Sequence, residues 1–401
     1  MITLTWWNRP NLKNYDAIIC DGSIRSGKTL SMSIGFINWS MTRFNGQIFA
    51  ICGKTIEALR RNVVAHLPLW LEGIYTITER RTENKLIVSA GGHTNTYYLF
   101  GGKDESSYSL IQGMTLAGVL FDEVALMARS FVEQAMARCS VMGSKFWFNC
   151  NPENPSHWFY LEWILKRKQK NALYLHFTMN DNASLSEDIK NRYENMYTGV
   201  FYRRYILGLW VRAEGLVYPM FDRDKHVISN MPVFNARHRY FVAIDYGTVN
   251  PFAAGLYDYD PVGQTATKIK ELYYRGGSAK RVDNEAYYKM LKKLIGDYPI
   301  ECIIIDPSAA AMVETILKYG EYDVRKAIND VLNGIQTVTK YLNAGVLKFH
   351  SSCKSTFLEF DAYSWKEDTS VDAVIKENDH AMDELRYFCY TILRDELMFE
   401  I

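Results

Sequence analysis

Residues 22–29 carry the pattern of a phosphate-binding loop. Their order, which matches G-x-x-x-x-G-K-[ST] throughout, is Gly22-Ser23-Ile24-Arg25-Ser26-Gly27-Lys28-Thr29. Apolar runs precede and follow the loop, and this strand–loop–helix context makes a chance glycine turn the weaker interpretation. In such a loop the backbone N–H groups surround phosphate oxygens, Lys28 reaches the β- and γ-phosphates, and the Thr29 hydroxyl ligates Mg²⁺. The motif therefore predicts that residues 22–29 bind ATP.

Two carboxylates, Asp122 and Glu123, directly follow the apolar run Gly118–Phe121. A P-loop ATPase needs an acidic residue at a strand end to hold the metal ion, and a general base to polarise the attacking water. We therefore assign Asp122 to Mg²⁺ and Glu123 to the water. The alternative is that the pair begins a solvent-exposed helix. The apolar run before the pair, which is typical of a buried strand, argues against this alternative.

Three further polar side chains are candidates for the nucleotide site. Asn149 and Asn151 end another apolar run, and either of them could sense the γ-phosphate; a turn at Asn151-Pro152 explains the same residues equally well. Arg25 lies inside the loop, where a cation could stabilise charge on the transferring phosphoryl group as an arginine finger does. A solvated loop arginine is the alternative. Asn149 and Arg25 are kept as site candidates.

A second group of acidic residues lies in the C-terminal half. Asp245 and Asp306 each end an apolar run, and Asp383 lies on a predicted helix, three residues after His380 and so on the same face. An isolated Asp at a strand end is usually a turn residue or a helix cap. Carboxylates that converge from strands and a helix can instead hold two divalent ions roughly 3.5–4 Å apart, as in a two-metal phosphodiesterase. Hard oxygen ligands favour Mg²⁺, with Mn²⁺ as a substitute.

The elements that position these residues alternate between short apolar strands and helices. Most of the runs are continuous, as expected for parallel strands covered on both faces, which predicts an α/β fold. Strands are predicted at Tyr15–Cys20, Gln47–Cys52, Thr96–Phe100, Leu116–Phe121, Lys145–Cys150, Ala172–Thr178, Tyr240–Tyr246, Phe252–Tyr257, Thr267–Tyr274 and Glu301–Asp306. Helices are predicted after Lys28 and at Thr55–Leu67, Ser130–Arg138, His157–Lys168, Val282–Leu294, Ala309–Tyr319 and Glu377–Leu393. An aperiodic linker or hinge, 212–235, separates a first domain, 1–211, from a second, 236–401.

Composition limits the class of protein. The 401 residues are 48% apolar and 23% charged, with a net charge of +1, which is ordinary for a globular protein and neither requires nor excludes nucleic acid. Basic clusters occur at Lys166–Lys170, Arg60-Arg61, Arg80-Arg81, Arg203-Arg204 and Lys280-Arg281, and the sequence singles out none of them as a DNA contact. Seven cysteines without a C-x-x-C pair argue against a zinc site or a disulfide framework and favour a reducing cytoplasm. Neither a signal peptide nor a membrane-spanning run is predicted.

Taken together, the motifs resemble those of the large subunit of tailed-bacteriophage terminases. The resemblance covers nearly the whole chain and rests on Gly22–Thr29, Gly118–Glu123, Phe146–Pro152, Leu207–Trp210, Tyr218-Pro219, Ile244–Gly247, Asp306–Ser308 and Asp379–Asp383. It implies an ASCE-type P-loop ATPase domain that translocates double-stranded DNA, then an RNase H-like nuclease domain that cuts concatemeric DNA. The residues that match the ATPase motifs are Lys28, Thr29, Asp122 and Glu123, and those that match the nuclease metal ligands are Asp245, Asp306 and Asp383. Many members of the family open this loop with Gly-Gly, whereas this chain has Asp21-Gly22. Asp21 could cap the turn.

We therefore expect an ATP-driven DNA-packaging motor that is also a metal-dependent endonuclease. The resemblance implies double-stranded DNA, a terminase small subunit and the portal protein of a procapsid as partners, in the host bacterial cytoplasm and away from membranes. It also implies that the protein forms a homo-oligomeric ring when it is docked on the portal. Whether the protein is a monomer in solution is left open. A helicase or recombination ATPase without a nuclease is one alternative, but it would not need the acids of the C-terminal half. A DNA-binding assembly protein with a nucleotide switch is another, but it would not need Glu123.

Overall fold

The computed structural model describes residues 2–246, 251–274, 282–367 and 371–394. The basic pair Lys280-Arg281 lies outside these residues. The chain forms two compact units, of which the first comprises residues 1–191 and 202–212, and the second residues 192–201 and 213–401. The chain therefore passes between the units after residues 191, 201 and 212. Among the described residues, no helix combines the length and apolar character that crossing a membrane requires.

The first unit is built on an eight-stranded sheet in the order β3-β4-β5-β2-β6-β7-β1-β8. Its strands are β1 (Ala17–Gly22), β2 (Ile48–Gly53), β3 (Thr76–Arg80), β4 (Lys85–Ala90), β5 (His93–Gly101), β6 (Gly118–Phe121), β7 (Lys145–Asn149) and β8 (Ala172–Phe177). From β5 to β8 every neighbouring pair is parallel, as predicted, whereas β3 and β4 form an antiparallel edge that the sequence analysis did not predict.

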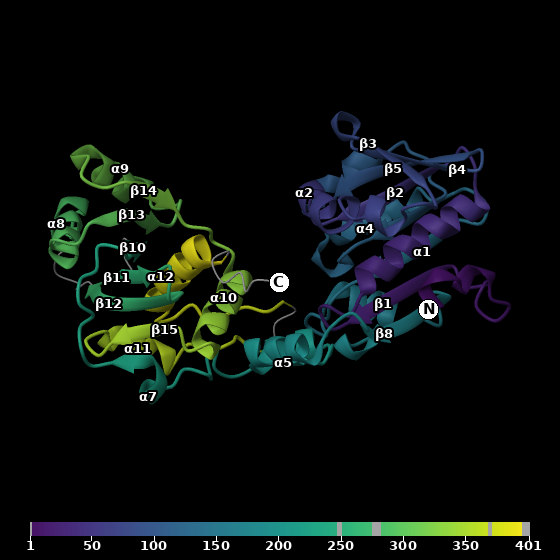
Figure 1. The fold of residues 1–401 in the computed structure, drawn as a ribbon. Helices are drawn as coiled ribbons and strands as arrows, with labels where there is room; N and C mark the ends of the chain where they lie inside the picture. Colours follow the sequence, from purple (N-terminus) through teal and green to yellow (C-terminus); the bar gives the residue numbers. More distant parts are fainter. Residues whose placement is uncertain (1, 247–250, 275–281, 368–370, 395–401) are drawn as a thin grey trace. The chain divides into compact units, whose positions relative to one another are not determined.

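Helices cover both faces of this sheet (Figure 1). They include α1 (Lys28–Arg43), α2 (Ile56–Leu59), α3 (Leu67–Trp70) and α4 (Arg129–Ala137). A further helix, α5 (Glu187–Met196), continues from this unit into the second. Shorter helical turns occur at Ile2–Leu4, Trp6–Asn8, Arg60–Val64, Arg81–Glu83, Glu105–Ile111, Val124–Leu126, Tyr160–Ile164, Met179–Asp181 and Tyr202–Ile206. Along β1, Ile18 and Cys20 pack into one core, and Ala17 and Ile19 into the other. This two-sided burial is why the strand reads as a continuous apolar run.

The second unit is built on a seven-stranded sheet in the order β14-β13-β10-β11-β12-β15-β9. Its strands are β9 (Val227–Ile228), β10 (Arg239–Asp245), β11 (Phe252–Asp260), β12 (Thr265–Tyr274), β13 (Ile300–Ile305), β14 (Val324–Lys326) and β15 (Leu347–His350). The central strands β10, β11 and β12 are antiparallel, and β13 lies parallel to β10. This mixed sheet is the RNase H-like arrangement that the resemblance implied.

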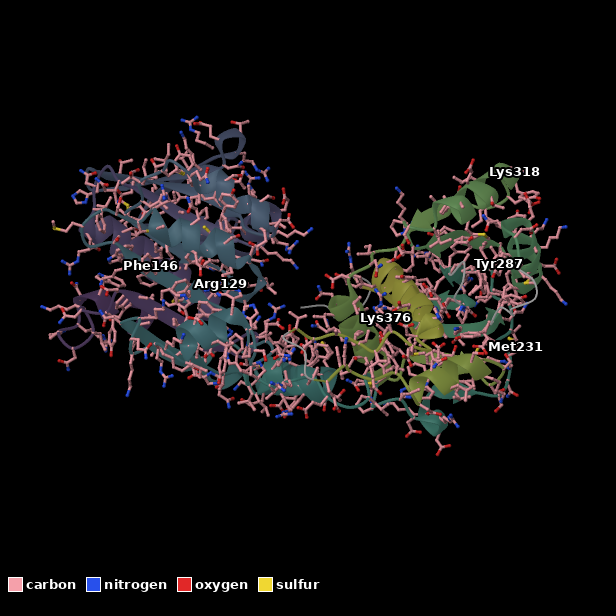
Figure 2. All side chains as sticks on the ribbon, turned by 180° about the vertical axis from the view of Figure 1, so that it is seen from behind. Arg129, Phe146, Met231, Tyr287, Lys318 and Lys376 are labelled. Carbon is pink, nitrogen blue, oxygen red and sulfur yellow. The ribbon has the colours of Figure 1, made fainter. Side chains whose placement is uncertain are left out.

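Helices of the second unit include three that match predictions, α8 (Asn284–Ile295), α9 (Ala310–Tyr319) and α12 (His380–Phe388). The others are α6 (Gly199–Phe201), α7 (Arg223–His226), α10 (Val331–Asn343), α11 (Lys354–Phe360) and the turn Cys389–Leu393. The start predicted for α12 at Glu377 is wrong, because the helix begins at His380. Side chains show which positions are interior: Tyr287 of α8 is buried, whereas Lys318 of α9 projects from the surface (Figure 2).

The segment predicted as a linker is mostly folded into the second unit. Residues 213–235 belong to that unit. Leu216 bridges to Ser364, and β9 adds a short strand beside β15. The imidazole of His226 is buried and bonds to the carbonyl of Leu342 at 2.9 Å. These contacts fix much of the segment on the nuclease-like sheet.

Candidate nucleotide and nuclease sites

The phosphate-binding loop connects β1 to α1 at the carboxyl edge of the parallel strands. Gly22 and Gly27 have φ values of 128° and 81°, a region that glycine enters without a steric penalty. A Cβ on Gly22 would stand 1.9 Å from the carbonyl oxygen of Phe177 in β8, so no larger residue fits there. The loop therefore needs both glycines for its backbone path, and Gly22 also for its close contact with β8.

The Lys28 ammonium is folded back onto the loop. It donates to the carbonyl oxygens of Gly22 at 3.1 Å and Ser23 at 2.6 Å, and to the Asn151 side-chain oxygen at 3.0 Å. Burial lowers the pKa of Lys28 to about 8. Asn151, one of the two asparagines that the sequence left open, thus contacts the lysine of the loop directly.

The two acids that follow β6 are tied to the loop through Thr29 and Asn149. The Thr29 hydroxyl donates to Asp122 Oδ1 at 3.0 Å, and the Asn149 amide donates to the same oxygen at 2.9 Å. The Asn149 oxygen in turn accepts the backbone N–H of Glu123 at 3.0 Å. Burial raises the pKa of both carboxyls, and the Asp122 charge adds to this effect on Glu123. Asn149 therefore holds the Asp122 carboxylate and the backbone of Glu123 at once, because β6 and β7 are parallel neighbours.

Asp21 has a different role from the turn cap suggested by its position. Its side chain is fully buried, and it accepts hydrogen bonds from His176 at 2.9 Å and from the Trp210 indole at 2.8 Å. The hydrogen bond with Asp21 raises the pKa of His176. Trp210 belongs to the segment 202–212, whose Tyr205 carbonyl also accepts the N–H of Ile24 at 2.8 Å. Asp21 thus fastens this segment to the phosphate-binding loop.

Arg25, the candidate arginine finger, is exposed and has a φ of 56°. Its backbone carbonyl accepts the Asn182 amide at 2.7 Å. Its role in hydrolysis stays a prediction.

In the second unit, sheet register places two of the predicted acids at one edge. Ile244 of β10 is paired with Ile305 of the parallel strand β13, and the next residues along the chain are Asp245 and Asp306. The helix α12 packs on β10 and β13 and also on β11, where the Phe388 ring stacks on Tyr257 at a centroid distance of 3.9 Å. This packing carries Asp383 to the edge.

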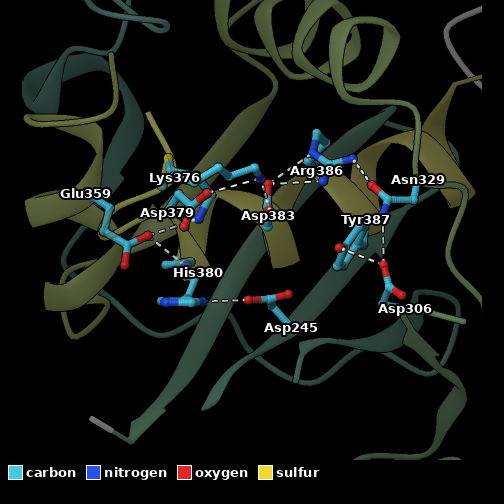
Figure 3. A network of polar contacts seen from close by, with 12 residues as sticks. Asp245, Asp306, Asn329, Glu359, Lys376, Asp379, His380, Asp383, Arg386 and Tyr387 are labelled. Atoms are coloured by element: carbon cyan, nitrogen blue, oxygen red, sulfur yellow. Dashed lines mark hydrogen bonds and ion pairs between the residues drawn. The ribbon is translucent and has the colours of Figure 1, made fainter. Parts of the chain in front are cut away.

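Each of the three acids has its own polar partners (Figure 3). Asp245 bonds to His380 at 2.8 Å. Asp383 accepts from Lys376 at 2.9 Å on one oxygen and from Arg386 at 3.0 Å on the other. Asp306 accepts hydrogen bonds through its side-chain oxygens from the Tyr387 hydroxyl at 3.0 Å, the Asn329 amide at 2.8 Å and the Ser308 N–H at 2.7 Å.

The pKa values of two of these acids shift in opposite directions. Burial raises the pKa of Asp245, whereas hydrogen bonds from Ser308 and Tyr387 outweigh burial and lower that of Asp306. The bond to Asp245 raises the pKa of His380 despite the burial of its ring.

A pocket of about 490 Å³ opens at this edge. Its lining includes Asp245, Lys376, Asp379, His380 and Asp383, but not Asp306. Hard carboxylate oxygens on two sides of one pocket suit a divalent ion such as Mg²⁺. In the part of the chain that the structure describes, however, no three His, Cys, Asp or Glu side chains are gathered closely enough to enclose an ion. The donor chemistry fits a metal, and the assignment of Asp245, Asp306 and Asp383 as its ligands stays a prediction.

Several residues of this network were not predicted from the sequence. Lys376 and Arg386 neutralise Asp383, and Asn329 links Arg386 to Asp306. Glu359 of α11 accepts the backbone N–H groups of residues 381 and 382 at 2.7 and 3.2 Å, and burial raises its pKa to about 7. The sequence pattern could have indicated Lys376, because it lies three residues before Asp379. No pattern in the sequence indicates Glu359 or Asn329.

Comparison with known proteins shows which family the chain resembles. The family model of the T4likevirus-type terminase large subunit, N-terminal region, matches residues 19–225. The structure of the large terminase from a thermophilic bacteriophage is 48% identical, covers 98% of each chain and superposes with a TM-score of 0.92. Structures of that phage protein with ADP (48% identity, 98% of each chain, TM-score 0.89) and with ATP-gamma-S (47%, 98% of each chain, 0.88) are also similar. No curated protein matches the chain.

The two folds and their sites define an ATPase joined to an RNase H-like nuclease. With this identity over almost its whole length, the chain belongs to the bacteriophage large-terminase family, the ATPase–nucleases of viral DNA packaging. This membership favours the packaging motor over the helicase and over the nucleotide-switched assembly protein.

Proposed function

We propose that the first unit hydrolyses ATP with Glu123 as general base, and that this drives double-stranded DNA into a procapsid. The observation that carries the proposal is the hydrogen bond between Thr29 and Asp122, which joins the loop to the acidic strand end. The ADP and ATP-gamma-S complexes of the large terminase from the thermophilic bacteriophage support nucleotide binding here. Lys28 would contact the phosphates, and Thr29 and Asp122 would hold Mg²⁺.

We further propose that the second unit cuts DNA at the edge formed by β10, β13 and α12. Asp245, Asp306 and Asp383 would hold divalent ions, Mg²⁺ or Mn²⁺, which when bound supply positive charge to the scissile phosphate. The chain's own residues set up this edge: His380 orients Asp245, and Arg386 orients Asp383. The observation that carries this part is the register that aligns Asp245 with Asp306.

The partners follow from the family. We propose that the protein acts in the host bacterial cytoplasm with double-stranded DNA, a terminase small subunit and the portal protein. A ring of copies would form on the portal.

The ATPase assignment is tested with Glu123→Gln. We expect steady-state ATP hydrolysis to fall to background, while plasmid nicking in Mn²⁺ is retained, because Glu123 belongs to the first unit alone. The matched control is Glu133→Gln, an exposed glutamate of the same unit that pairs with Arg129. Retained ATPase activity in Glu123→Gln would contradict the role of general base.

The nuclease assignment is tested with Asp245→Ala. Nicking should be lost and ATP hydrolysis retained, with Asp361→Ala, an exposed aspartate of the second unit, as the control. If Asp245→Ala still nicks DNA at the rate of the control, the proposed nuclease site is wrong.

A further inference from the structure

The carboxylates of the proposed nuclease site are already bridged by a cation of the chain itself. The Lys376 ammonium lies 3.1 Å from Asp379 Oδ2 and 2.9 Å from Asp383 Oδ2 (Figure 3). The other Asp383 oxygen is held by Arg386. Both oxygens of Asp383 are therefore engaged by positive side chains.

These two cations differ in how firmly they are held. The Arg386 side chain is 1% exposed and also donates to Asn329, so it is part of the packed interior. The Lys376 side chain is 57% exposed, and it lies on the segment that precedes α12. A half-exposed lysine on a flexible four-carbon stem can leave its partner at little cost, whereas a buried arginine cannot.

Lys376 also occupies the place where a divalent ion would approach. It lines the same pocket as Asp245, Asp379 and Asp383. An ammonium and a divalent ion cannot share one carboxylate oxygen without strong repulsion.

We propose that Lys376 is a tethered cation that holds Asp379 and Asp383 together in the metal-free protein and competes with divalent ions for Asp383. This inference rests on the proposed nuclease function and assigns it a positioning residue. The side chain keeps like charges from separating the pocket walls when no ion is bound. It must leave Asp383 Oδ2 before that oxygen can act as a ligand. Lys376 thereby raises the metal concentration at which the site fills.

The test is Mn²⁺ binding, measured by calorimetry on the full chain without nucleotide. Lys376→Met keeps the length of the side chain and removes its charge, and we expect it to bind Mn²⁺ about 1.5-fold to fivefold more tightly, the range for one partly exposed ion pair. Lys376→Arg keeps the competitor, so it should bind as the native chain does. The matched control is Lys318→Met, an exposed lysine that pairs with Glu285 on α8.

A second readout is thermal unfolding in EDTA and in Mn²⁺. Lys376→Met should unfold earlier than the native chain in EDTA and gain more from Mn²⁺, because it lacks the ammonium between Asp379 and Asp383 and the metal can take that place. Equal or weaker Mn²⁺ binding by Lys376→Met would overturn the proposal.

Asp245→Ala separates this failure from that of the nuclease site. Its residual Mn²⁺ binding reports ions held elsewhere. If Asp245→Ala binds as much Mn²⁺ as the native chain, both the proposed metal site and the role of Lys376 are wrong. If Asp245→Ala loses Mn²⁺ binding but Lys376→Met binds Mn²⁺ as the native chain does, only the proposed competition by Lys376 is wrong.

Discussion

The buried ion pair between Lys268 of β12 and Glu384 of α12 provides the sharpest quantitative prediction. The two side chains are 1% and 0% exposed and in direct contact. Lys268 also donates to Thr356 at 2.8 Å, and Glu384 accepts the Tyr257 hydroxyl at 2.8 Å. Glu384→Met would leave the Lys268 ammonium buried without its counter-charge.

The expected loss follows from that burial. Removing one partner of a buried pair costs about 3–5 kcal/mol of unfolding free energy. For a unit of roughly 150–250 residues, each kcal/mol shifts Tm by about 2–4 °C, so the transition of the second unit should fall by about 6–20 °C. Lys268→Met combined with Glu384→Met removes both charges, and it should recover most of the loss because methionines fill a similar volume.

The assay is a double-mutant cycle followed by thermal unfolding, with ATP hydrolysis as a check that the first unit is intact. Lys318→Met is the exposed-pair control and should cost less than about 1 kcal/mol. The reasoning is refuted if Glu384→Met loses no more stability than the control, or if the double variant is as unstable as Glu384→Met.

Three other predictions concern the supports of the two sites. Asn149→Ala removes the hydrogen bonds to the Asp122 carboxylate and to the backbone N–H of Glu123, and a loss of about 1.5–3 kcal/mol for the bond to the charged group should lower kcat for ATP hydrolysis by about 10–100-fold in a steady-state assay, with Mn²⁺-dependent nicking unchanged. Trp210→Phe deletes one donor to a buried carboxylate and should destabilise the first unit by about 1.5–3 kcal/mol in urea unfolding; an unchanged midpoint would contradict this role. The pKa of Glu359 is raised from 4.5 to about 7, so its contribution is complete below pH 4.5 and is lost as pH rises through 7. The unfolding midpoint of Glu359→Gln should therefore vary less than that of the native chain over this window.

Local patterns in the sequence determined the phosphate-binding loop and most strands. Gly22–Thr29 is contiguous, and its strand–loop–helix context is visible without any distant contact. The central strands of both sheets were predictable because burial on both faces produces continuous apolar runs. The edge strands β3 and β4 were missed, since exposed edges alternate polar and apolar residues over a short span.

Only the tertiary structure decided which polar groups meet. Asn149 contacts Asp122 and the backbone of Glu123 because β7 lies beside β6. His380 contacts Asp245, which lies 135 positions earlier in the chain, because α12 packs on β10. The sequence places acids at strand ends, but strand order and register choose their neighbours. For the same reason the contact between Lys376 and Asp383 could not be predicted. The charge of Lys376 is visible in the sequence, but its position beside Asp383 depends on the path of the chain before α12. The sequence thus determined the chemistry available, and the packing of helices on sheets determined which groups can act together.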